Sequence, residues 1–378
     1  MVKTIIFFQP TINGHYLEYM HHEYMESVAH EEIKIIFIVP SSFKQKKNML
    51  KWPPANHIEF SYLTDDEENK CKVTSKFKQA INQTLISRKY INKYNADGIF
   101  FNSLVNLMPV LPFFIPRGCK VSGIIYNNYL WNTTEGSIKK FVNYTLYKLF
   151  AIHRSFHSIF LLNDEKSVEV LNARHKVRRF KYLPDPIQDI DMLKIINVRE
   201  KLGIKQSDTV FLQLGIQNRK HALDILSAID MASDESLNNK AFIFTGVFAN
   251  GIEEEYKMRI KKLRSKAKII DLSGRIPFDE LYNLFSISDF CFALYDNTSM
   301  SSGVVGYSSF FGSNIIGPSQ GLLGHLIKEY RLGICIDEIT PQSILSTFTQ
   351  SKIEVDREYC KTHRVEDFNY CIFSEILY

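Results

Sequence analysis

Residues 286–337 read SISDFCFALYDNTSMSSGVVGYSSFFGSNIIGPSQGLLGHLIKEYRLGICID, and they alternate between apolar strands and small-residue helices. A buried strand is predicted over Phe290–Leu294, and a polar loop follows it. The turn Ser301–Gly303 then opens a helix over Val304–Phe310, and a second strand follows at Asn314–Ile316. Strands separated by single helices are typical of a parallel sheet, so this stretch predicts an α/β fold.

The turn at Ser301–Val304 is a candidate binding site for an anion. The first backbone N–H groups of a helix have no partner within the helix, and the helix dipole favours negative charge there. A phosphate-bearing ligand would satisfy these groups. Serine is also a good helix N-cap, so an ordinary capped helix explains the same residues equally well.

The alternation of strands and helices extends over the whole chain and is interrupted once. The segment Leu183-Pro184-Asp185-Pro186 cannot continue a helix or a central strand. We therefore predict two Rossmann-like doubly wound domains facing across a cleft, over residues 1–184 and 185–378. Whether the last helix packs back on the first domain is left open. The predicted strands are 3–8, 33–39, 58–62, 98–101, 120–126, 158–162 and 180–182 in the first domain, and 209–214, 241–245, 269–272, 290–294, 314–316 and 333–336 in the second.

The composition narrows the class of protein. Of 378 residues, 45% are apolar and 23% charged, and the formal net charge is +5. This charge is too small to indicate a nucleic-acid-binding protein, and it suits a small anionic ligand. The six cysteines form no C-x-x-C pair, which indicates buried, reduced thiols and no metal site. No apolar run reaches the roughly 20 residues that span a bilayer, and no signal-peptide pattern is present, so we expect a cytoplasmic protein.

The loop after the first predicted strand contains Gly14 and His15. Gly14 permits a tight turn, and His15 would begin the next helix beside the predicted cleft. The loop does not read G-x-G-x-x-G, so a nicotinamide-binding fingerprint is absent. A plain strand–helix turn explains Gly14 equally well, whereas the position of His15 favours a functional role.

The second domain opens with a buried strand that ends at Gly215, and Arg219 and Lys220 stand where a helix over 220–231 is predicted to begin. Cations at a helix N-terminus are unfavourable because they oppose the dipole. An anionic ligand beyond the end of the strand explains them better than a solvated surface pair does. The backbone at Ile276, after the strand 269–272, would border the same cleft.

Two basic segments have competing interpretations. Residues 174–181 carry several Lys and Arg, and the predicted helix 137–152 carries Lys139, Lys140 and Lys148 among aromatic residues. A solvated face and an ordinary amphipathic core helix explain them most simply. Contact with an anionic membrane surface is the alternative.

Several segments of the second domain follow one another in a particular order. They are Gly215–Lys220, Ser273–Pro277, Ser288–Phe290, Gly312–Ile316, Gly321–Leu326 and Leu332-Gly333. In this order they resemble the carboxyl-terminal domain of family 4-type glycosyltransferases, also called glycosyl transferases group 1, which have the two-Rossmann GT-B fold. The Leu183–Pro186 linker and the Asn13–His15 loop fit the same plan.

The resemblance implies a nucleotide-sugar donor as substrate, with no cofactor and no metal. Lys220 matches the family's phosphate-binding lysine, and the turn Ser302–Val304 matches the segment whose backbone meets the diphosphate. Ile276 matches the base-reading loop, and Gly14 and His15 match the amino-domain loop near donor and acceptor. The predicted catalytic residues are Lys220, Arg219 and His15, and the predicted donor-binding residues are Gly14, Gly215, Ile276, Ser302, Gly303, Val304 and Tyr307.

The chain departs from the family at three of the positions named for it. Two glutamates usually stand where this chain has Ser299 and Tyr307, and the second of them normally holds the donor ribose. The family's usual phosphate-binding arginine follows the glycine, where this chain has Ile216. These differences bear on the type of donor and on whether the chain is active.

The resemblance predicts a retaining glycosyltransferase that moves a sugar from a nucleotide sugar to a glycan or lipid-linked acceptor in surface polysaccharide biosynthesis. The predicted partners include the cytoplasmic face of the membrane as a peripheral contact and no nucleic acid. Two alternatives stand beside this prediction. One is a catalytically decayed nucleotide-sugar-binding or scaffolding protein, and the other is a nucleotide-sugar epimerase.

Overall fold

A computed structural model describes residues 2–12, 15–50, 52–126, 128–131, 136–188, 190–248 and 251–377. The chain divides by its contacts into two compact units. The first unit comprises Met1–Tyr129, Thr134–Pro184 and Val365–Tyr378, and the second comprises Leu130–Thr133 and Asp185–Arg364. The main chain therefore passes from the first unit to the second between Pro184 and Asp185, and its last segment returns to the first unit.

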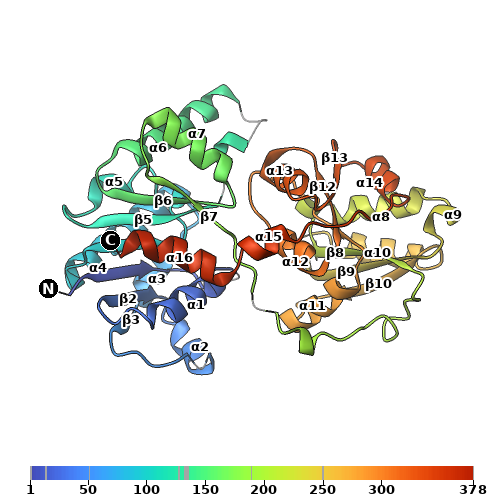
Figure 1. Ribbon diagram of the computed structural model, residues 1–378, viewed down its shortest axis with the longest axis horizontal. Coiled ribbons are helices and arrows are strands. Elements are labelled where there is room, and N and C mark those ends of the chain that lie inside the picture. The colour runs from blue at the N-terminus through green and yellow to red at the C-terminus, as the bar shows by residue number, and fades with distance from the viewer. Residues whose placement is uncertain are drawn as a thin grey trace. The chain divides into compact units, whose positions relative to one another are not determined.

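The first unit is built on a seven-stranded parallel sheet in the order β3-β2-β1-β4-β5-β6-β7 (Figure 1). Its strands are β1 (Thr4–Phe8), β2 (Lys34–Val39), β3 (Ile58–Tyr62), β4 (Gly98–Phe101), β5 (Lys120–Ile125), β6 (Phe156–Leu162) and β7 (Phe180–Leu183). Its α-helices are α1 (His15–Ser27), α2 (Phe43–Met49), α3 (Asp65–Cys71), α4 (Lys76–Tyr94), α5 (Leu111–Phe114), α6 (Ser137–Ile152), α7 (Glu165–His175) and α16 (Val365–Ile376).

The second unit is built on a six-stranded parallel sheet in the order β10-β9-β8-β11-β12-β13. Its strands are β8 (Thr209–Ile216), β9 (Lys240–Phe248), β10 (Lys268–Ser273), β11 (Phe290–Phe292), β12 (Asn314–Pro318) and β13 (Gly333–Ile336). Its α-helices are α8 (Ala222–Met231), α9 (Asp234–Leu237), α10 (Glu253–Leu263), α11 (Phe278–Ile287), α12 (Gly303–Phe311), α13 (Gly321–Glu329), α14 (Pro341–Thr347) and α15 (Glu358–Thr362).

Each sheet is covered on both faces because its strands are apolar on both faces. In β8, Phe211 packs into a core with α8, α10 and α14, while its neighbours Val210 and Leu212 pack into a second core with α11, α12 and α13. Successive side chains of a strand point to opposite faces, so one continuous apolar strand supplies two cores. The fold class predicted from the sequence, two Rossmann-like doubly wound domains, is confirmed.

Two charged segments, whose sequences resemble exposed loops, are helical. Residues 44–54 include most of α2, and the acidic residues 65–68 begin α3. In α3 the Thr64 hydroxyl accepts from the Glu67 backbone N–H, and the Glu67 carboxylate accepts from the Thr64 N–H. This reciprocal capping stabilises a helix whose charged sequence resembles a loop.

All six cysteines are free, and Cys71, Cys119 and Cys291 are buried. Burial raises the pKa of each of these three thiols to about 12, so they are protonated and unreactive at neutral pH. Among the described helices, none combines the length and the apolar character needed to cross a bilayer. The same described residues hold no group of three or more His, Cys, Asp or Glu arranged to bind a metal ion.

Candidate functional site

The strand order of the second unit reverses between β8 and β11. β9 and β10 lie on one side of β8, and β11, β12 and β13 lie on the other (Figure 1). The loops that leave the carboxyl ends of β8 and β11 therefore run in opposite directions, and open α/β sheets bind ligands at switch points of this kind. Lys220 follows β8, and Tyr295 follows β11.

The Lys220 side chain folds back over the end of β8. Its Nζ donates to the carbonyl oxygen of Leu214 at 2.9 Å. A Cβ placed on Gly215 would lie 2.8 Å from this Nζ, and the backbone φ of Gly215 is +85°. Gly215 is therefore required both for its left-handed backbone and for the space that the lysine occupies.

Lys220 lies before α8 and not in its first turn, contrary to the sequence prediction. Residues Asn218–Lys220 form a 3₁₀ turn, and His221 is left-handed with φ 54°, which separates this turn from the helix that starts at Ala222. The expected conflict between a cation and the α8 dipole does not arise. The lysine is held instead by its hydrogen bond to the Leu214 carbonyl, and it occupies the space that Gly215 leaves by having no side chain.

The electrostatics of Lys220 favour a bound anion. Burial lowers the pKa of Lys220, and the nearby Arg219 guanidinium lowers it further. Its Nζ lies 5.5 Å from the centre of the Tyr295 ring, an interaction that favours the charged ammonium. A phosphate at this point would supply the negative charge that favours the half-buried ammonium.

Tyr295 connects Lys220 to the start of α12. Its hydroxyl lies 3.0 Å from the Ser302 Oγ, and burial raises the pKa of Tyr295 to about 12. Ser302 is the N-cap of α12 and accepts from the Val304 N–H at 3.4 Å. The neighbouring Ser301 donates to the Asp185 carboxylate at 2.8 Å. One tyrosine therefore connects the lysine to the amino end of α12, where Gly303 is the first helical residue.

Three glycines lie at the carboxyl ends of three neighbouring strands of the second sheet. Gly215, Gly246 and Gly274 lie at the carboxyl ends of β8, β9 and β10, and all three have positive φ. A Cβ on Gly246 would lie 2.8 Å from the Gly215 Cα, and the Gly274 N–H donates to the Gly246 carbonyl at 3.0 Å. This edge therefore presents bare backbone beside Lys220.

The other predicted residues of the second unit lie in different surroundings. Arg219 is exposed, and its carbonyl accepts from the Asp296 N–H at 3.2 Å. Ile276 is half-buried in the loop between β10 and α11 and packs against the core. The Tyr307 ring packs on α11, with centroids 5.5 Å from Tyr282 and 5.3 Å from Phe285. An aromatic contact therefore occupies the position at which the resemblance leads us to expect a ribose-binding glutamate.

Sequence reasoning missed three residues of this site. Gln213 is buried and donates from Nε2 to the carbonyls of Gly215 at 3.0 Å and Lys220 at 3.2 Å, which ties the loop into a closed turn. His221 contacts the Asp224 carboxylate at 2.8 Å and the Asp296 carboxylate at 2.9 Å. Tyr295 is the third. The sequence offered one signal, which was position: Gln213 is a polar residue within the buried strand β8, His221 follows that strand, and Tyr295 follows β11.

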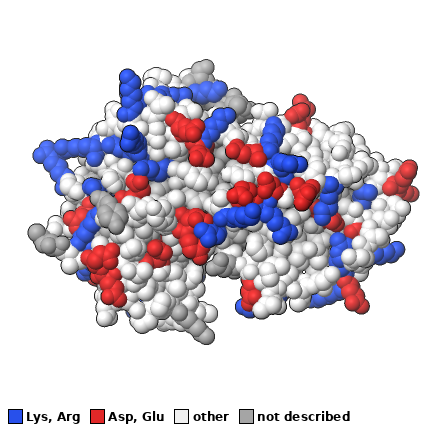
Figure 2. All heavy atoms as spheres, in the orientation of Figure 1, with Lys and Arg blue, Asp and Glu red and all other residues white. Residues whose placement is uncertain are grey.

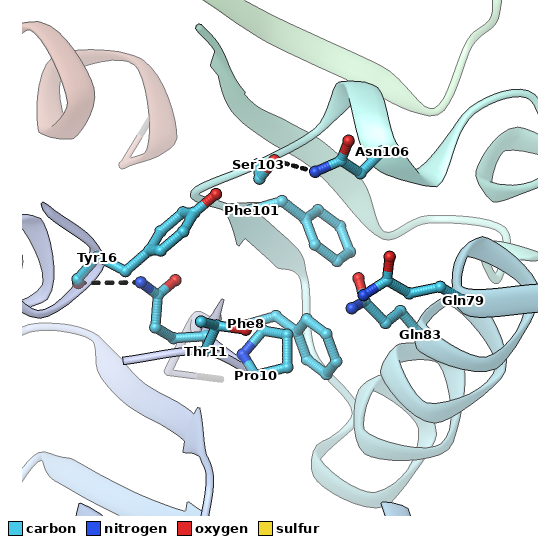
Figure 3. A pocket seen from close by; sticks show the side chains of 10 residues that line it. Phe8, Pro10, Thr11, Tyr16, Gln79, Gln83, Phe101, Ser103 and Asn106 are labelled. Atoms are coloured by element: carbon cyan, nitrogen blue, oxygen red, sulfur yellow. Dashed lines mark hydrogen bonds between the residues drawn. The ribbon is translucent and has the colours of Figure 1, made fainter. Parts of the chain in front are cut away.

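The first unit has an equivalent switch point between β1 and β4, and a pocket of about 170 Å³ lies there (Figure 3). The ends of the two strands line it with Phe8, Gln9 and Phe101, and the loops after them add Pro10, Thr11, Ser103 and Asn106. Tyr16 enters from α1, and Gln79 and Gln83 extend from α4 on the opposite side. Gly14 lies outside the described residues, and His15 begins α1 with its side chain outside the described set.

Comparison with known proteins identifies the fold and not the family. No protein-family model matches the chain, and no curated protein matches it. Solved structures match over almost the full length. WaaG, a glycosyltransferase involved in lipopolysaccharide biosynthesis, is 14% identical with a TM-score of 0.61, over 98% of this chain and 97% of that one.

Two further neighbours carry different descriptions. Anabaena HepE in complex with UDP-glucose is 13% identical with a TM-score of 0.65, over 99% of both chains. A putative UDP-N-acetylglucosamine 2-epimerase from Listeria monocytogenes is 10% identical with a TM-score of 0.62, over 100% of this chain and 96% of that one. These likenesses show the GT-B fold, and because they include both a glycosyltransferase and an epimerase, they do not by themselves assign an activity.

Proposed function

We propose that this chain is a glycosyltransferase that moves a sugar from a nucleotide-sugar donor to a glycan or lipid-linked acceptor. The second unit would bind the donor and the first unit the acceptor. The observation that carries the proposal is the half-buried ammonium of Lys220 at the β8/β11 switch point, folded over Gly215 and linked through Tyr295 to the amino end of α12.

In the proposed reaction an acceptor hydroxyl oxygen bonds to the anomeric carbon on the same face from which the diphosphate leaves, while the bond from that carbon to the diphosphate oxygen breaks. The nucleoside diphosphate departs with the electron pair, and its leaving oxygen takes the hydroxyl proton. Negative charge grows on the diphosphate, and Lys220 and the N–H groups of the first turn of α12 would stabilise it. The reaction would retain the anomeric configuration, as the resemblance implies.

Gly215, Ser302, Gly303 and Val304 would meet the diphosphate with backbone groups, and the half-buried Ile276 loop would contact the base. Arg219 would complete the part of the donor site that lies on the second unit, and the roles of Gly14 and His15 rest on the resemblance alone. Tyr307 would form part of the wall behind the donor, since its ring packs on α11 and contacts Tyr282 and Phe285. Because the neighbour HepE was solved in complex with UDP-glucose, UDP is the first nucleotide to test.

The epimerase alternative is favoured only by the Listeria neighbour. An epimerase would interconvert free nucleotide sugars with no acceptor, so the products distinguish it from a transferase. The decayed nucleotide-sugar-binding alternative is favoured by Ser299 and Tyr307 in place of two glutamates. It predicts nucleotide binding without turnover across a broad acceptor panel.

Calorimetric titration of the full chain with UDP, GDP, ADP and their sugar conjugates tests the donor site. We expect one nucleotide to bind selectively, and Lys220→Ala to weaken it by about 10- to 100-fold because a charge-assisted contact is lost. Lys261→Ala, an exposed lysine on α10, is the matched control and should bind as the parent does. Equal binding by Lys220→Ala and the parent protein would refute the phosphate assignment.

We further propose that the protein works at the cytoplasmic membrane face, in surface polysaccharide biosynthesis. The outer side of α6 exposes Ile138 (83%) and Phe141 (69%), and α5 exposes Phe113 (70%). Figure 2 shows basic side chains on the first unit, and the exposed cations Arg117, Lys120 and Arg154 lie around Phe113. Exposed apolar side chains among cations suit an anionic lipid surface.

A further inference from the structure

The pocket of the first unit differs in chemistry from the Lys220 site. Among its ten lining residues there is no Lys, Arg, His, Asp or Glu. Its polar groups are carboxamides and hydroxyls, including that of Tyr16, and two phenylalanine rings accompany them. At about 170 Å³ it is smaller than the roughly 300 Å³ at which drug-sized sites begin, so it suits a ligand of about one ring.

Two carboxamides are fixed on one wall. Gln79 and Gln83 lie one turn apart on α4, so they point in the same direction (Figure 3). Both Nε2 groups donate to the Cys71 carbonyl oxygen, at 2.7 Å and 3.2 Å. Because the amide nitrogens are held by this shared partner, the amide oxygens are left as acceptors for a ligand's hydroxyl protons.

The groups that face the two glutamines across the pocket supply hydrogen-bond donors. Asn106 Nδ2 donates to Ser103 Oγ at 2.8 Å, so the Ser103 hydroxyl proton can be given to a ligand oxygen. The Tyr16 hydroxyl is a second donor, and Gln9, buried beneath it, donates to the Tyr16 carbonyl at 3.0 Å and fixes the start of α1. Acceptors on one side and donors on the other match the vicinal hydroxyls of a sugar, each of which donates and accepts.

The apolar part of the pocket suits the C–H face of a sugar ring. Phe8 and Phe101 are buried at the strand ends and contact each other edge to face, with centroids 5.5 Å apart. Pro10 adds a further apolar surface. Pockets of this kind gain affinity from apolar contact and orientation from a few fixed polar groups.

We infer that this pocket binds one ring of an uncharged saccharide, as the acceptor subsite of the glycosyltransferase proposed above. The role of the saccharide as an acceptor rests on the proposed function. The class of ligand, an uncharged saccharide, rests on the lining of the pocket alone. An anionic sugar is disfavoured because burying its charge here would leave it without a compensating cation.

Saccharide binding by the full chain tests the inference in the absence of nucleotide. The probes are the methyl glycosides of glucose, galactose and N-acetylglucosamine, with methyl glucuronide and glucose 6-phosphate as anionic counterparts, titrated at millimolar concentration by ligand-observed NMR. We expect at least one neutral probe to bind and the anionic ones to bind more weakly. Gln83→Ala and Ser103→Ala should each weaken the neutral probe by roughly tenfold.

The matched control is Asn82→Ala. This neighbouring carboxamide on α4 donates to the Lys70 carbonyl at 2.9 Å and does not line the pocket, so its loss should leave saccharide binding unchanged. Ser103→Ala removes only a hydroxyl, so it keeps the test informative if Gln83→Ala unfolds.

Three results would overturn the inference: anionic probes that bind as tightly as neutral ones, binding that neither pocket variant weakens, or no saccharide binding at all. Nucleotide binding by the parent protein, measured separately, would then still stand in support of the donor site. Conversely, saccharide binding in a protein that binds no nucleotide would leave the pocket intact and refute the transferase.

Discussion

At the scale of single residues, Gly246 is the position where the candidate site tolerates least change. A Cβ on it would lie 2.8 Å from the Cα and 2.9 Å from the N of Gly215, which are backbone atoms that cannot turn aside. Its φ of +105° also belongs to glycine. The close approach brings β9 against the loop that carries Lys220.

We expect Gly246→Ala to destabilise the second unit and to displace the Lys220 loop. Gly251→Ala is the matched control, because Gly251 also has positive φ, +89°, but nothing lies within 4 Å of its Cβ position. The control should cost only the backbone strain, about 1–2 kcal/mol, and Gly246→Ala clearly more. Denaturant unfolding of both variants provides the measurement, and equal losses would show that the close contact is unimportant.

The chemistry of some residues could be predicted from the sequence alone. Gly215 and Lys220 were recognisable because a glycine ends a buried strand and a cation follows it. The reason given for Lys220 was nevertheless wrong, since the left-handed His221 delays α8 by two residues. Gly246 and Tyr295 were missed because their roles depend on neighbours from other strands, which no local pattern encodes.

At the scale of elements, helix α1 and strand β4 share a buried carboxyl group. Glu23 of α1 is fully buried, and Asn102, directly after β4, donates to its Oε2 at 3.2 Å. Burial raises the pKa of Glu23 well above its usual value, so the folded protein holds the proton. The unfolded chain releases that proton above about pH 4.5, so stability is lost as pH rises from there toward the folded pKa.

We therefore expect Glu23→Gln to be more stable than the parent, by an amount that grows as pH rises above about 4.5. Glutamine keeps the acceptor for Asn102 and cannot ionise. The free energy of unfolding measured from pH 4 to 8 checks this, with the exposed Glu31→Gln as control. Parallel pH profiles for Glu23→Gln and the parent would contradict it.

The positions of the buried strands were predicted better than the short surface helices and the pocket between the elements. The apolar runs of β1, β2 and β12 set strand positions to within a residue or two, because burial on both faces leaves little freedom in composition. The short helices α2 and α3 escaped prediction because charged surface helices depend on caps more than on an apolar stripe. The pocket of the first unit was also missed, although Gln79 and Gln83 have helical spacing, since α4 meets β1 and β4 only in the fold.

At the scale of the whole molecule, the exposed apolar side of α6 makes a testable surface. We expect the protein to sediment with vesicles that contain anionic phospholipid, and less so as salt is raised. Phe141→Ser should weaken this binding about tenfold or more, because burying a phenylalanine is worth about 1.5–3 kcal/mol. Phe77→Ser, which changes an exposed phenylalanine of α4, is the control. Equal sedimentation of both variants would count against a membrane role for α6.

Helix α16 belongs to the first unit although it closes the described chain. Phe368, Ile372 and Phe373 pack into the core of the first sheet, and the Lys3 ammonium donates to the carbonyls of Ile376 and Leu377 at 3.0 Å and 2.6 Å. The Glu375 carboxylate pairs with Lys181 at 2.6 Å and accepts from Ser158 at 2.7 Å.

This arrangement reverses the order in which the two units can mature during translation. Domains usually fold as they leave the ribosome, beginning with the amino-terminal one. Here most of the second unit, Asp185–Arg364, has been synthesised before the helix that covers the first sheet exists. The core of the first unit therefore stays incomplete until α16 follows the second unit out of the ribosome, and the apolar residues that Phe368, Ile372 and Phe373 cover stay open until then. A nascent chain that has not yet released α16 is therefore a natural substrate for chaperones at its amino-terminal half.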